Sequence, residues 1–292
     1  NWNIDIVDRM SYASMGYSRL KEVNCYDDKR IRHFSHDFTL PIVDGLLDEL
    51  CDVDFILHLG AETHVDNSIE DSDKFVHTNI NGVYNILKLI TKKKARPILL
   101  HFSTDEVYGD ITNGSHNETD ILRPSNPYSA TKAAADMLIT AWARTYDVPY
   151  VIVRPTNNYG IGQYVEKFIP KSIKSLSLER PIPLHDQGNP RRTWLHASDT
   201  AAAVVTLIES GVKNDIFNIS GNYEEKNIVV AKKIIDIYYK QPVDYDRFLD
   251  MSIKRQGQDV RYAIDDSKIK ALGWKPTSNF DVELQKIVEY YT

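Results

Sequence analysis

The sequence predicts an α/β protein: a doubly wound parallel sheet with helices on both faces, followed by a smaller C-terminal α/β lobe. In the first half, short apolar runs alternate with longer segments whose apolar residues recur about every 3.6 positions. After residue 155 the elements become shorter and the loops richer in Pro, Asn, Gly and Arg, as in residues 179–196. We therefore divide the chain into residues 1–155 and 156–292, with some chain crossing between the lobes.

The first lobe contains four predicted strands and two long predicted helices. The strands cover residues 4–8, 55–60, 97–103 and 150–155, where apolar residues run together over too few positions for a helix. The helices cover residues 73–93 and 130–146. This alternation predicts parallel strands, and ligands bind at the carboxyl ends of such strands. Asp8, Gly60 and the pair Asp105–Glu106 all stand at these ends.

Composition and charge exclude some partners. The 292 residues are 42% hydrophobic and 26% charged, with a formal net charge of −6. The acidic balance argues against nucleic acid or an anionic membrane as a partner, and no apolar run approaches the roughly 20 residues of a membrane helix. Cys25 and Cys51 have no metal-ligand spacing, so we expect two buried, reduced thiols in a cytoplasmic protein and no metal site.

The pattern Y-x-x-x-K occurs three times, starting at Tyr17, Tyr84 and Tyr128. On a helix, positions i and i+4 share a face, so Lys132 can lie beside the Tyr128 hydroxyl. An ammonium there lowers the pKa of the phenol and lets it act as a base. Only Tyr128 opens a helix after a Pro-Ser-Asn-Pro turn, beyond a strand that ends in Ser-Thr. We therefore choose Tyr128 and Lys132 as the functional pair and interpret the other two as surface pairs.

Two adjacent carboxyl groups, Asp105 and Glu106, follow the apolar run 97–103. They are costly at the end of a buried strand unless they are solvated, hydrogen-bonded or used. By themselves they also fit a helix cap or a solvated pair. Neighbouring side chains on an extended backbone point in different directions, so one dipeptide can present carboxyl groups at two places.

Six segments resemble the nucleoside-diphosphate-glucose 4,6-dehydratases of the extended short-chain dehydrogenase/reductase family, whose fold is Rossmann-like. They follow one another along nearly the whole chain: AETHVDNSI (61–69), HFSTDEVYGD (101–110), NPYSATKAAADML (126–138), RPTNNYGIGQYVEKFIP (154–170), QGNPRRTWLH (187–196) and RQGQDVRYAID (255–265).

The resemblance implies a lyase that uses NAD. In this family C4 of the sugar gives hydride to NAD, water leaves across C5 and C6, and hydride returns to C6, which yields a 4-keto-6-deoxy sugar. By resemblance, Tyr128 with Lys132 takes the proton of the 4-hydroxyl and Thr104 hydrogen-bonds that hydroxyl. Glu106 is then the base at C5 and Asp105 the acid at C6. The acid must be protonated when it acts, so Asp105 should be the more buried of the two.

The resemblance also implies a cofactor site and a substrate site. Asp8 can bind both ribose hydroxyls of adenosine, which favours NAD, although a lone Asp after a strand is also typical of a turn or cap. The positions that resemble cofactor-binding residues are Asp8, Asp37, Phe38, Leu59, Gly60, Ala61, Thr78, Tyr128, Lys132 and Asn158.

The nucleoside-diphosphate sugar, dTDP-glucose first and UDP-glucose next, should lie between the lobes. We expect its diphosphate at the Asn and Arg positions, its hexose at Glu166 and Lys167, and its nucleobase at Pro183 and Leu184. The full set of expected contacts is Thr63, Thr104, Asn157, Glu166, Lys167, Phe168, Pro183, Leu184, Arg192, Asn227, Arg255 and Gln258.

Three positions depart from the family pattern: Asn67 replaces Arg, Gln256 replaces Pro and Gln258 replaces His. The changes at 67 and 258 remove positive charge near the cofactor or the diphosphate, so the exact sugar nucleotide stays open. A sugar-nucleotide epimerase or a UDP-glucuronate decarboxylase on the same scaffold is the alternative enzyme, and the adjacent Asp-Glu pair argues against both. A catalytically inactive binding protein is the alternative outside enzymes.

The sequence has no counterpart of the family's phosphate-binding G-x-x-G-x-x-G turn and begins at Asn1 without Met. In the family this turn lies one strand and one helix before a segment like residues 4–8. We therefore expect the Rossmann domain to lack its first strand and glycine loop. A polypeptide that truly begins at Asn1 should then bind NAD poorly and aggregate along an exposed sheet edge.

The two long helices resemble those with which the family forms a homodimer by four-helix packing. The second helix carries more apolar surface than one contact stripe requires: Ala130, Ala133, Ala134, Ala135, Met137 and Leu138. A homodimer is therefore the expected assembly.

Overall fold

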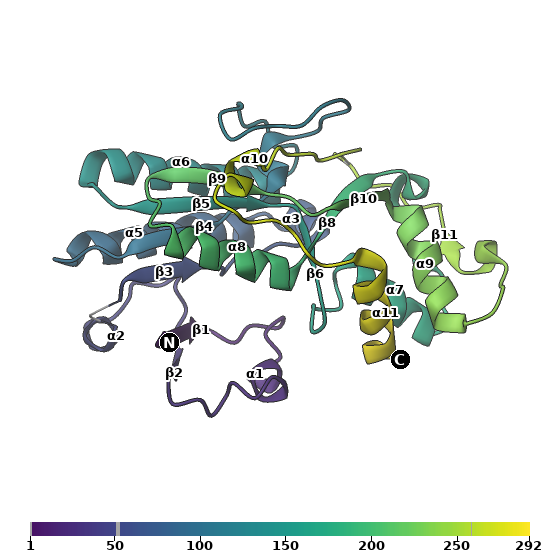
Figure 1. The fold of residues 1–292 in the computed structure, drawn as a ribbon, viewed down its shortest axis with the longest axis horizontal. Helices are drawn as coiled ribbons and strands as arrows, with labels where there is room; N and C mark the ends of the chain where they lie inside the picture. The colour runs from purple at the N-terminus through teal and green to yellow at the C-terminus, as the bar shows by residue number, and fades with distance from the viewer. Residues whose placement is uncertain (1, 51–52, 258) are drawn as a thin grey trace.

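A four-stranded parallel sheet forms the centre of the structure, a computed structural model that describes residues 2–50, 53–257 and 259–292. Its strand order is β3-β4-β5-β9, and all neighbours are parallel, as predicted (Figure 1). These strands are β3 (Phe55–His58), β4 (Ile98–Phe102), β5 (Tyr150–Pro155) and β9 (Asp215–Ile219). The strand β9 comes from the second half of the chain, so the chain does cross back to this sheet.

Helices cover both faces of this sheet because its side chains alternate between the faces. Leu99 and Ile152 pack with α5 (Gly82–Lys92) and α6 (Pro127–Tyr146) on one face. Leu100 and Val151 pack on the other face with α8 (Ala197–Glu209) and with residues of α10 (Ser267–Lys270). The period of two in the strands therefore produces two separate apolar layers, and the doubly wound α/β prediction is confirmed.

The two long helices form close to where they were predicted. Residues 73–92 are continuous, but their first half is α4 (Asp73–Phe75) followed by the π-helical segment η1 (Val76–Asn81) before α5 begins. The helix α6 begins at Pro127, three residues earlier than predicted. Asn126 forms a capping box with Ser129, and proline at the first helical position already has the required φ, so the sequence defines this start locally.

The strand at residues 4–8 forms as predicted but does not join the central sheet. It is β1 (Ile4–Asp8), and it pairs in parallel with β2 (Ile31–Ser35) in a separate two-stranded sheet. In Figure 1 these strands lie below β3, with α2 (Asp44–Glu49) to their left and α1 (Ser18–Glu22) to their lower right. Leu57 and Leu59, at the β3 edge of the central sheet, are 42% and 61% exposed.

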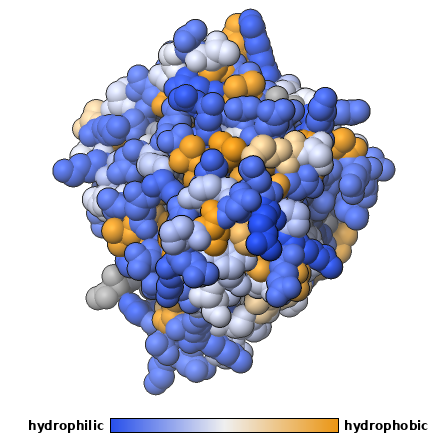
Figure 2. All heavy atoms as spheres, turned by 90° about the vertical axis from the view of Figure 1, so that its right-hand side faces the viewer, coloured by the Kyte–Doolittle hydropathy of each residue, from blue (hydrophilic) through white to orange (hydrophobic). Residues whose placement is uncertain are grey.

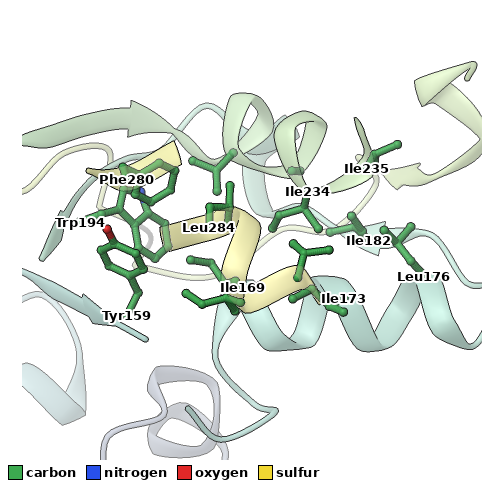
Figure 3. Close-up of a cluster of buried hydrophobic side chains, with 14 of the residues drawn as sticks. Tyr159, Ile169, Ile173, Leu176, Ile182, Trp194, Ile234, Ile235, Phe280 and Leu284 are labelled. Atoms are coloured by element: carbon green, nitrogen blue, oxygen red, sulfur yellow. The ribbon is translucent and has the colours of Figure 1, made fainter. Parts of the chain in front are cut away.

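The C-terminal lobe has its own core. Trp194, Tyr159 and Phe280 pack at one end of this core, and aliphatic side chains from three helices of the lobe fill the rest (Figure 3). Its elements are β6 (Asn157–Tyr159), α7 (Phe168–Ser177), β7 (Ile182–Pro183), η3 (His185–Gly188), β8 (Arg191–His196), β10 (Tyr223–Lys226), α9 (Asn227–Tyr239), η4 (Tyr245–Arg247), β11 (Leu249–Asp250) and α11 (Phe280–Tyr291).

The outer face of this lobe is mainly hydrophilic, with apolar atoms gathered near its middle (Figure 2). None of the described helices is long and apolar enough to cross a membrane. Cys25 is a free thiol, but it is only half-buried, so the expectation of a buried side chain is wrong for this residue. Its loop between α1 and β2 carries too few apolar neighbours to enclose it. Cys51 lies outside the described residues.

Candidate functional site

The acidic pair lies directly beyond the carboxyl end of β4, in the first turn of the short 3₁₀ helix η2 (Asp105–Tyr108). Thr104 is the N-cap of this turn, and its hydroxyl accepts a hydrogen bond from the Glu106 N–H at 3.3 Å. The predicted extended backbone is therefore wrong for the dipeptide, because this cap turns the chain one residue after the strand. The two carboxyl groups still reach different surroundings.

Asp105 is the more buried member of the pair, as predicted. Its side chain is 3% exposed, whereas Glu106 is half-buried. The Thr104 hydroxyl donates to Asp105 Oδ1 at 3.2 Å, and Oδ2 is buried without a protein partner in the described part of the chain. Burial, followed by the neighbouring Glu106 charge, raises the pKa of Asp105 to about 7. Asp105 is thus protonated in a pH range where a solvated aspartate is charged.

Glu106 lies among polar groups from three distant segments. Its Oε2 atom accepts from Asn126 Nδ2 at 3.4 Å and lies 3.3 Å from the Tyr262 hydroxyl, which also contacts Asp259. The Arg192 guanidinium stacks over the Tyr262 ring at 4.6 Å. Burial raises the pKa of Glu106, and the Arg192 charge opposes that rise. These contacts fix the carboxyl group while a cation favours its ionised form.

Tyr128 is buried near the amino end of α6, beside the acidic pair. Its pKa is raised, not lowered: burial acts first, the Glu106 charge next, and a hydrogen bond with Thr104 opposes both. The expected net lowering of this pKa is therefore wrong, because burial of the phenol is the largest cause of the rise and the charges of Glu106 and Asp105 add to it. The proximity of Tyr128, Thr104 and both acidic residues agrees with the set that the sequence selected.

Lys132 is 2% exposed, and its ammonium donates to His101 Nε2 on β4 at 3.3 Å. His101 Nδ1 lies 2.9 Å from His58 Nδ1 on β3, and the two rings are stacked. Burial lowers the pKa of Lys132 to about 8, and the Asp136 carboxylate opposes this shift. Lys132 was expected from the sequence, but the two histidines were not. Their only local signal was one polar side chain in each of the apolar runs that form β3 and β4.

Six of the predicted cofactor positions, Asp8, Asp37, Phe38, Leu59, Gly60 and Ala61, stand at or just after the carboxyl ends of β1, β2 and β3. Asp8 Oδ1 accepts from the Met10 N–H at 2.7 Å, so this carboxylate does cap a turn. Asp37 accepts from Thr39 and pairs with Arg9 at 3.2 Å. The remaining positions are Leu59, which is exposed; Gly60 and Ala61, which are half-buried; Thr78, which is buried; and Asn158, which donates to Thr156 O.

Phe38 lies between two glycines at this edge. A Cβ atom at Gly60 or at Gly82 would come within 2.4 Å of the Phe38 ring, so only glycine leaves room for the ring at both places. The same ring contacts His58 edge to face at 5.2 Å. Phe38 thus joins β2 to β3 and α5 through packing alone.

Several predicted substrate contacts also come together. Lys167 Nζ donates to Thr63 Oγ1 at 2.7 Å and pairs with Glu166 at 3.5 Å, which joins the loop after β3 to the start of α7. Asn157 and Asn227 each have a buried side-chain oxygen without a protein partner among the described residues. Such orphaned acceptors in a polar site are places where a ligand donor or water can bind.

Other expected contacts have different surroundings. Leu184 is 1% exposed within the C-terminal core, so its side chain cannot pack on a nucleobase; Pro183 beside it is half-buried. Phe168 packs its ring against Trp194. Arg255 makes a bidentate pair with Asp66, at 2.5 and 2.9 Å, and lies 3.2 Å from His185. Gln258 lies outside the described residues.

Sequence reasoning missed Tyr262, Asn126 and Asp66 as members of this site. Each stands inside a segment that resembles the family, but nothing in the local pattern marks its side chain as a neighbour of Glu106 or Arg255. Among the described residues there is no cluster of three His, Cys, Asp or Glu side chains that could hold a metal ion.

Both the sequence and the fold of this chain are similar to those of known proteins. The family model described as GDP-mannose 4,6 dehydratase matches residues 5–287. A dTDP-glucose 4,6-dehydratase from Mycolicibacterium smegmatis is 37% identical over 294 residues, which cover 99% of this chain and 85% of the relative. The crystal structure of DesIV, a dTDP-glucose 4,6-dehydratase from Streptomyces venezuelae with NAD bound, matches with a TM-score of 0.91 and 33% identity, covering 99% of this chain and 87% of that chain.

A more distant structure shares only the fold. The UDP-glucuronic acid 4-epimerase from Bacillus cereus matches with a TM-score of 0.89 but 21% identity, covering 99% of this chain and 90% of that chain. Because epimerases and dehydratases share this scaffold, the fold does not separate the two activities. The side chains of the site have to do so.

Proposed function

The chain belongs to the GDP-mannose 4,6 dehydratase family, and from this premise we propose that it dehydrates a nucleoside-diphosphate glucose to the 4-keto-6-deoxy sugar with NAD as its cofactor. The observation that carries this proposal is the pair of adjacent carboxyl groups in different environments beside Tyr128. Asp105 is buried with a raised pKa, and Glu106 faces Arg192. Elimination of water needs one acid and one base, whereas a 4-epimerisation needs no such pair at C5 and C6.

The residues present fit the nucleoside end of NAD. Asp8 and Asp37 place carboxylates at the carboxyl ends of two parallel strands, where ribose hydroxyls are usually bound. Tyr128 and Lys132 would lie at the nicotinamide end, and Leu59, Gly60, Ala61, Thr78 and Asn158 are proposed to line the space between. When bound, NAD takes up the hydride from C4 of the sugar and returns it to C6, so the overall reaction has no net redox change.

The side chains of the chain then move protons. Tyr128 takes the proton of the sugar 4-hydroxyl, which Thr104 also hydrogen-bonds. The resulting 4-ketone acidifies the C5–H bond, and Glu106 removes that proton. Asp105 gives its proton to the departing 6-hydroxyl, which leaves as water. Asp105 thus begins in the protonated state that its environment favours, whereas the ionised state of Glu106 is favoured by Arg192 against the effect of burial.

Positively charged and amide side chains between the lobes are proposed to bind the sugar nucleotide. Arg192, Asn157 and Asn227 would meet the diphosphate, and Glu166 with Lys167 the hexose. Arg255 is paired with Asp66 through Nε and Nη2, so the diphosphate would compete with Asp66 for this guanidinium group. Of the candidate nucleotides we propose dTDP-glucose, the substrate in the names of the relatives.

The test is incubation of the purified protein and NAD with dTDP-glucose, UDP-glucose, GDP-mannose or UDP-glucuronate in parallel. We expect dTDP-glucose to lose one water by mass spectrometry and to yield the absorbance of a 4-keto sugar. An unchanged mass with an altered sugar configuration would identify an epimerase. Loss of carbon dioxide from UDP-glucuronate would identify a decarboxylase. Binding of all these nucleotides without turnover would identify an inactive binding protein.

Assembly is a separate proposal: a homodimer formed through α5 and α6. Met137 on α6 is 55% exposed, and Tyr84 on α5 is 40% exposed and packs against Trp142 of α6, so apolar side chains project from this helix pair. In Figure 1 these helices lie at the opposite side of the molecule from the C-terminal lobe, whose face is mainly hydrophilic in Figure 2.

Light scattering at micromolar concentration should therefore report a dimer. Met137→Glu should shift the population to monomer, because a charge buried in an apolar interface is costly. Val282→Glu is the matched control, since Val282 is 50% exposed on α11, away from this pair of helices. A monomeric wild-type protein would contradict the dimer.

A further inference from the structure

A buried row of three basic side chains joins β3, β4 and α6: His58, His101 and Lys132. Their exposed fractions are 5%, 0% and 2%. His58 and His101 follow one another across the parallel strands, because the register of the sheet pairs these two residues directly. Lys132 reaches His101 from the helix above. Basic side chains are rarely buried next to one another in a core unless hydrogen bonds connect them.

The hydrogen bonds fix which nitrogen carries each proton. An ammonium has donors only, so His101 Nε2, 3.3 Å from Lys132 Nζ, must be an unprotonated acceptor. A neutral His101 then carries its proton on Nδ1 and donates it to His58 Nδ1 at 2.9 Å. His58 in turn carries its proton on Nε2, which is buried without a protein partner in the described part of the chain. If Lys132 were a neutral amine that accepted from His101, both tautomers would reverse.

We propose that His101, held in one tautomer by His58, is a positioning residue that keeps Lys132 a charged ammonium, one turn of α6 after Tyr128. The inference rests on the proposed function, in which Tyr128 acts as the base at the 4-hydroxyl. Lys132 has no carboxylate at hydrogen-bond distance among the ion pairs of the described residues. A neutral imidazole is therefore the group that accepts from the ammonium, without the cost of a second buried charge.

The charged groups around the row support this assignment. Asp136, one turn further along α6, favours the ammonium, but its carboxylate is paired with Arg154 of β5 at 3.0 Å. Burial and the Lys132 charge lower the pKa values of both histidines, to about 3 for His58, so both rings stay neutral at physiological pH. On the other side, Asp105 and Glu106 face Tyr128. The neutral acceptor on β4 therefore supplies the hydrogen bond of this buried ammonium, while Asp136 supplies an opposing charge.

The first test determines the tautomer of His101 and does not depend on catalytic activity. The wild-type protein with NAD, labelled with ¹⁵N at histidine, is examined by NMR at neutral pH, with His101→Gln used to assign the ring. We expect His101 neutral, protonated at Nδ1 and unprotonated at Nε2. A proton on Nε2 of His101 would overturn the proposal, and it would do so whether or not the protein dehydrates a sugar.

The second test measures the contribution of His101 to catalysis. His101→Leu should lower kcat about 10- to 100-fold with little change in KM, because one hydrogen bond to a charged group is lost. It should also move the acid limb of the pH profile of C4 oxidation, measured as reduced NAD in a single turnover, upward by about one pH unit, since a less charged Lys132 stabilises the Tyr128 anion less. In His101→Gln the side-chain oxygen replaces Nε2 as acceptor, and kcat should return to within a few-fold of the wild-type value.

The control is His116→Gln. Like His101, His116 stacks on an aromatic ring, that of Tyr108, and forms a hydrogen bond through Nδ1. Its partner, however, is Asp120, which lies outside the site. Its profile should match the wild type. Equal losses in His101→Leu and His101→Gln, or a wild-type profile in His101→Leu, would overturn the proposal.

Discussion

Tyr128→Phe should abolish oxidation at C4. The substitution removes the only atom that takes the proton of the 4-hydroxyl, while the buried ring keeps its place against Phe75 at the start of α6. Loss of one general base typically costs about 10²–10⁴-fold in rate. Because every later step depends on the ketone, the whole reaction should fall by that factor. The measurement is the absorbance of reduced NAD after substrate is added in a single turnover.

Tyr84→Phe is the matched control for this variant. Tyr84 begins another Y-x-x-x-K pattern, but it is 40% exposed, and Lys88 lies over its ring rather than beside its hydroxyl. Turnover should stay within a few-fold of the wild type, as it should for Tyr17→Phe. An inactive Tyr84→Phe variant together with an active Tyr128→Phe variant would refute the assignment of Tyr128 as the base.

Glu106→Gln should separate oxidation from elimination. The amide keeps the size of the side chain and its neighbours Asn126 and Tyr262 but cannot take the C5 proton. We expect reduced NAD to accumulate, with no deuterium uptake at C5 and a loss of dehydration of roughly 10²–10⁴-fold. Asp105→Asn should do the reverse: C5 still exchanges with solvent, while water leaves slowly. Full dehydration by Glu106→Gln would end the assignment of the C5 base.

The same pair predicts the pH dependence of water loss. Asp105 acts when protonated, and its pKa is raised to about 7, so the rate should fall as pH rises through about 7. Glu106 acts when ionised, and its raised pKa makes the rate fall as pH decreases. The two groups interact, so the limbs of this bell-shaped profile belong to the pair. Asp105→Asn should remove the alkaline limb, which a pH–rate profile of product formation would reveal.

The sequence by itself determined the local structure and the order of the motifs. Short apolar runs predicted four of the five strands described in residues 1–155, because a strand buried on both faces needs only a run of apolar residues. The fifth strand, β2, was missed, because Arg32 and His33 interrupt its apolar residues. The Asn-Pro pair before Tyr128 defined the start of α6, and the i, i+4 spacing put Tyr128 and Lys132 on one helix. The burial of Asp105 was expected from the role that the resemblance implied, because a carboxyl group that acts as an acid needs a raised pKa.

Only the tertiary structure decided which distant groups meet. Tyr262 reaches Glu106 across 156 positions of the chain, and Arg255 reaches Asp66 across 189. Neither contact leaves a periodic signal, because periodicity records only which face of its own element a residue occupies. The pairing of β1 with β2, the raised pKa of Tyr128 and the contact of Lys132 with His101 depend in the same way on packed neighbours. The sequence thus selected the reacting groups, and packing between separate elements set their charge and orientation.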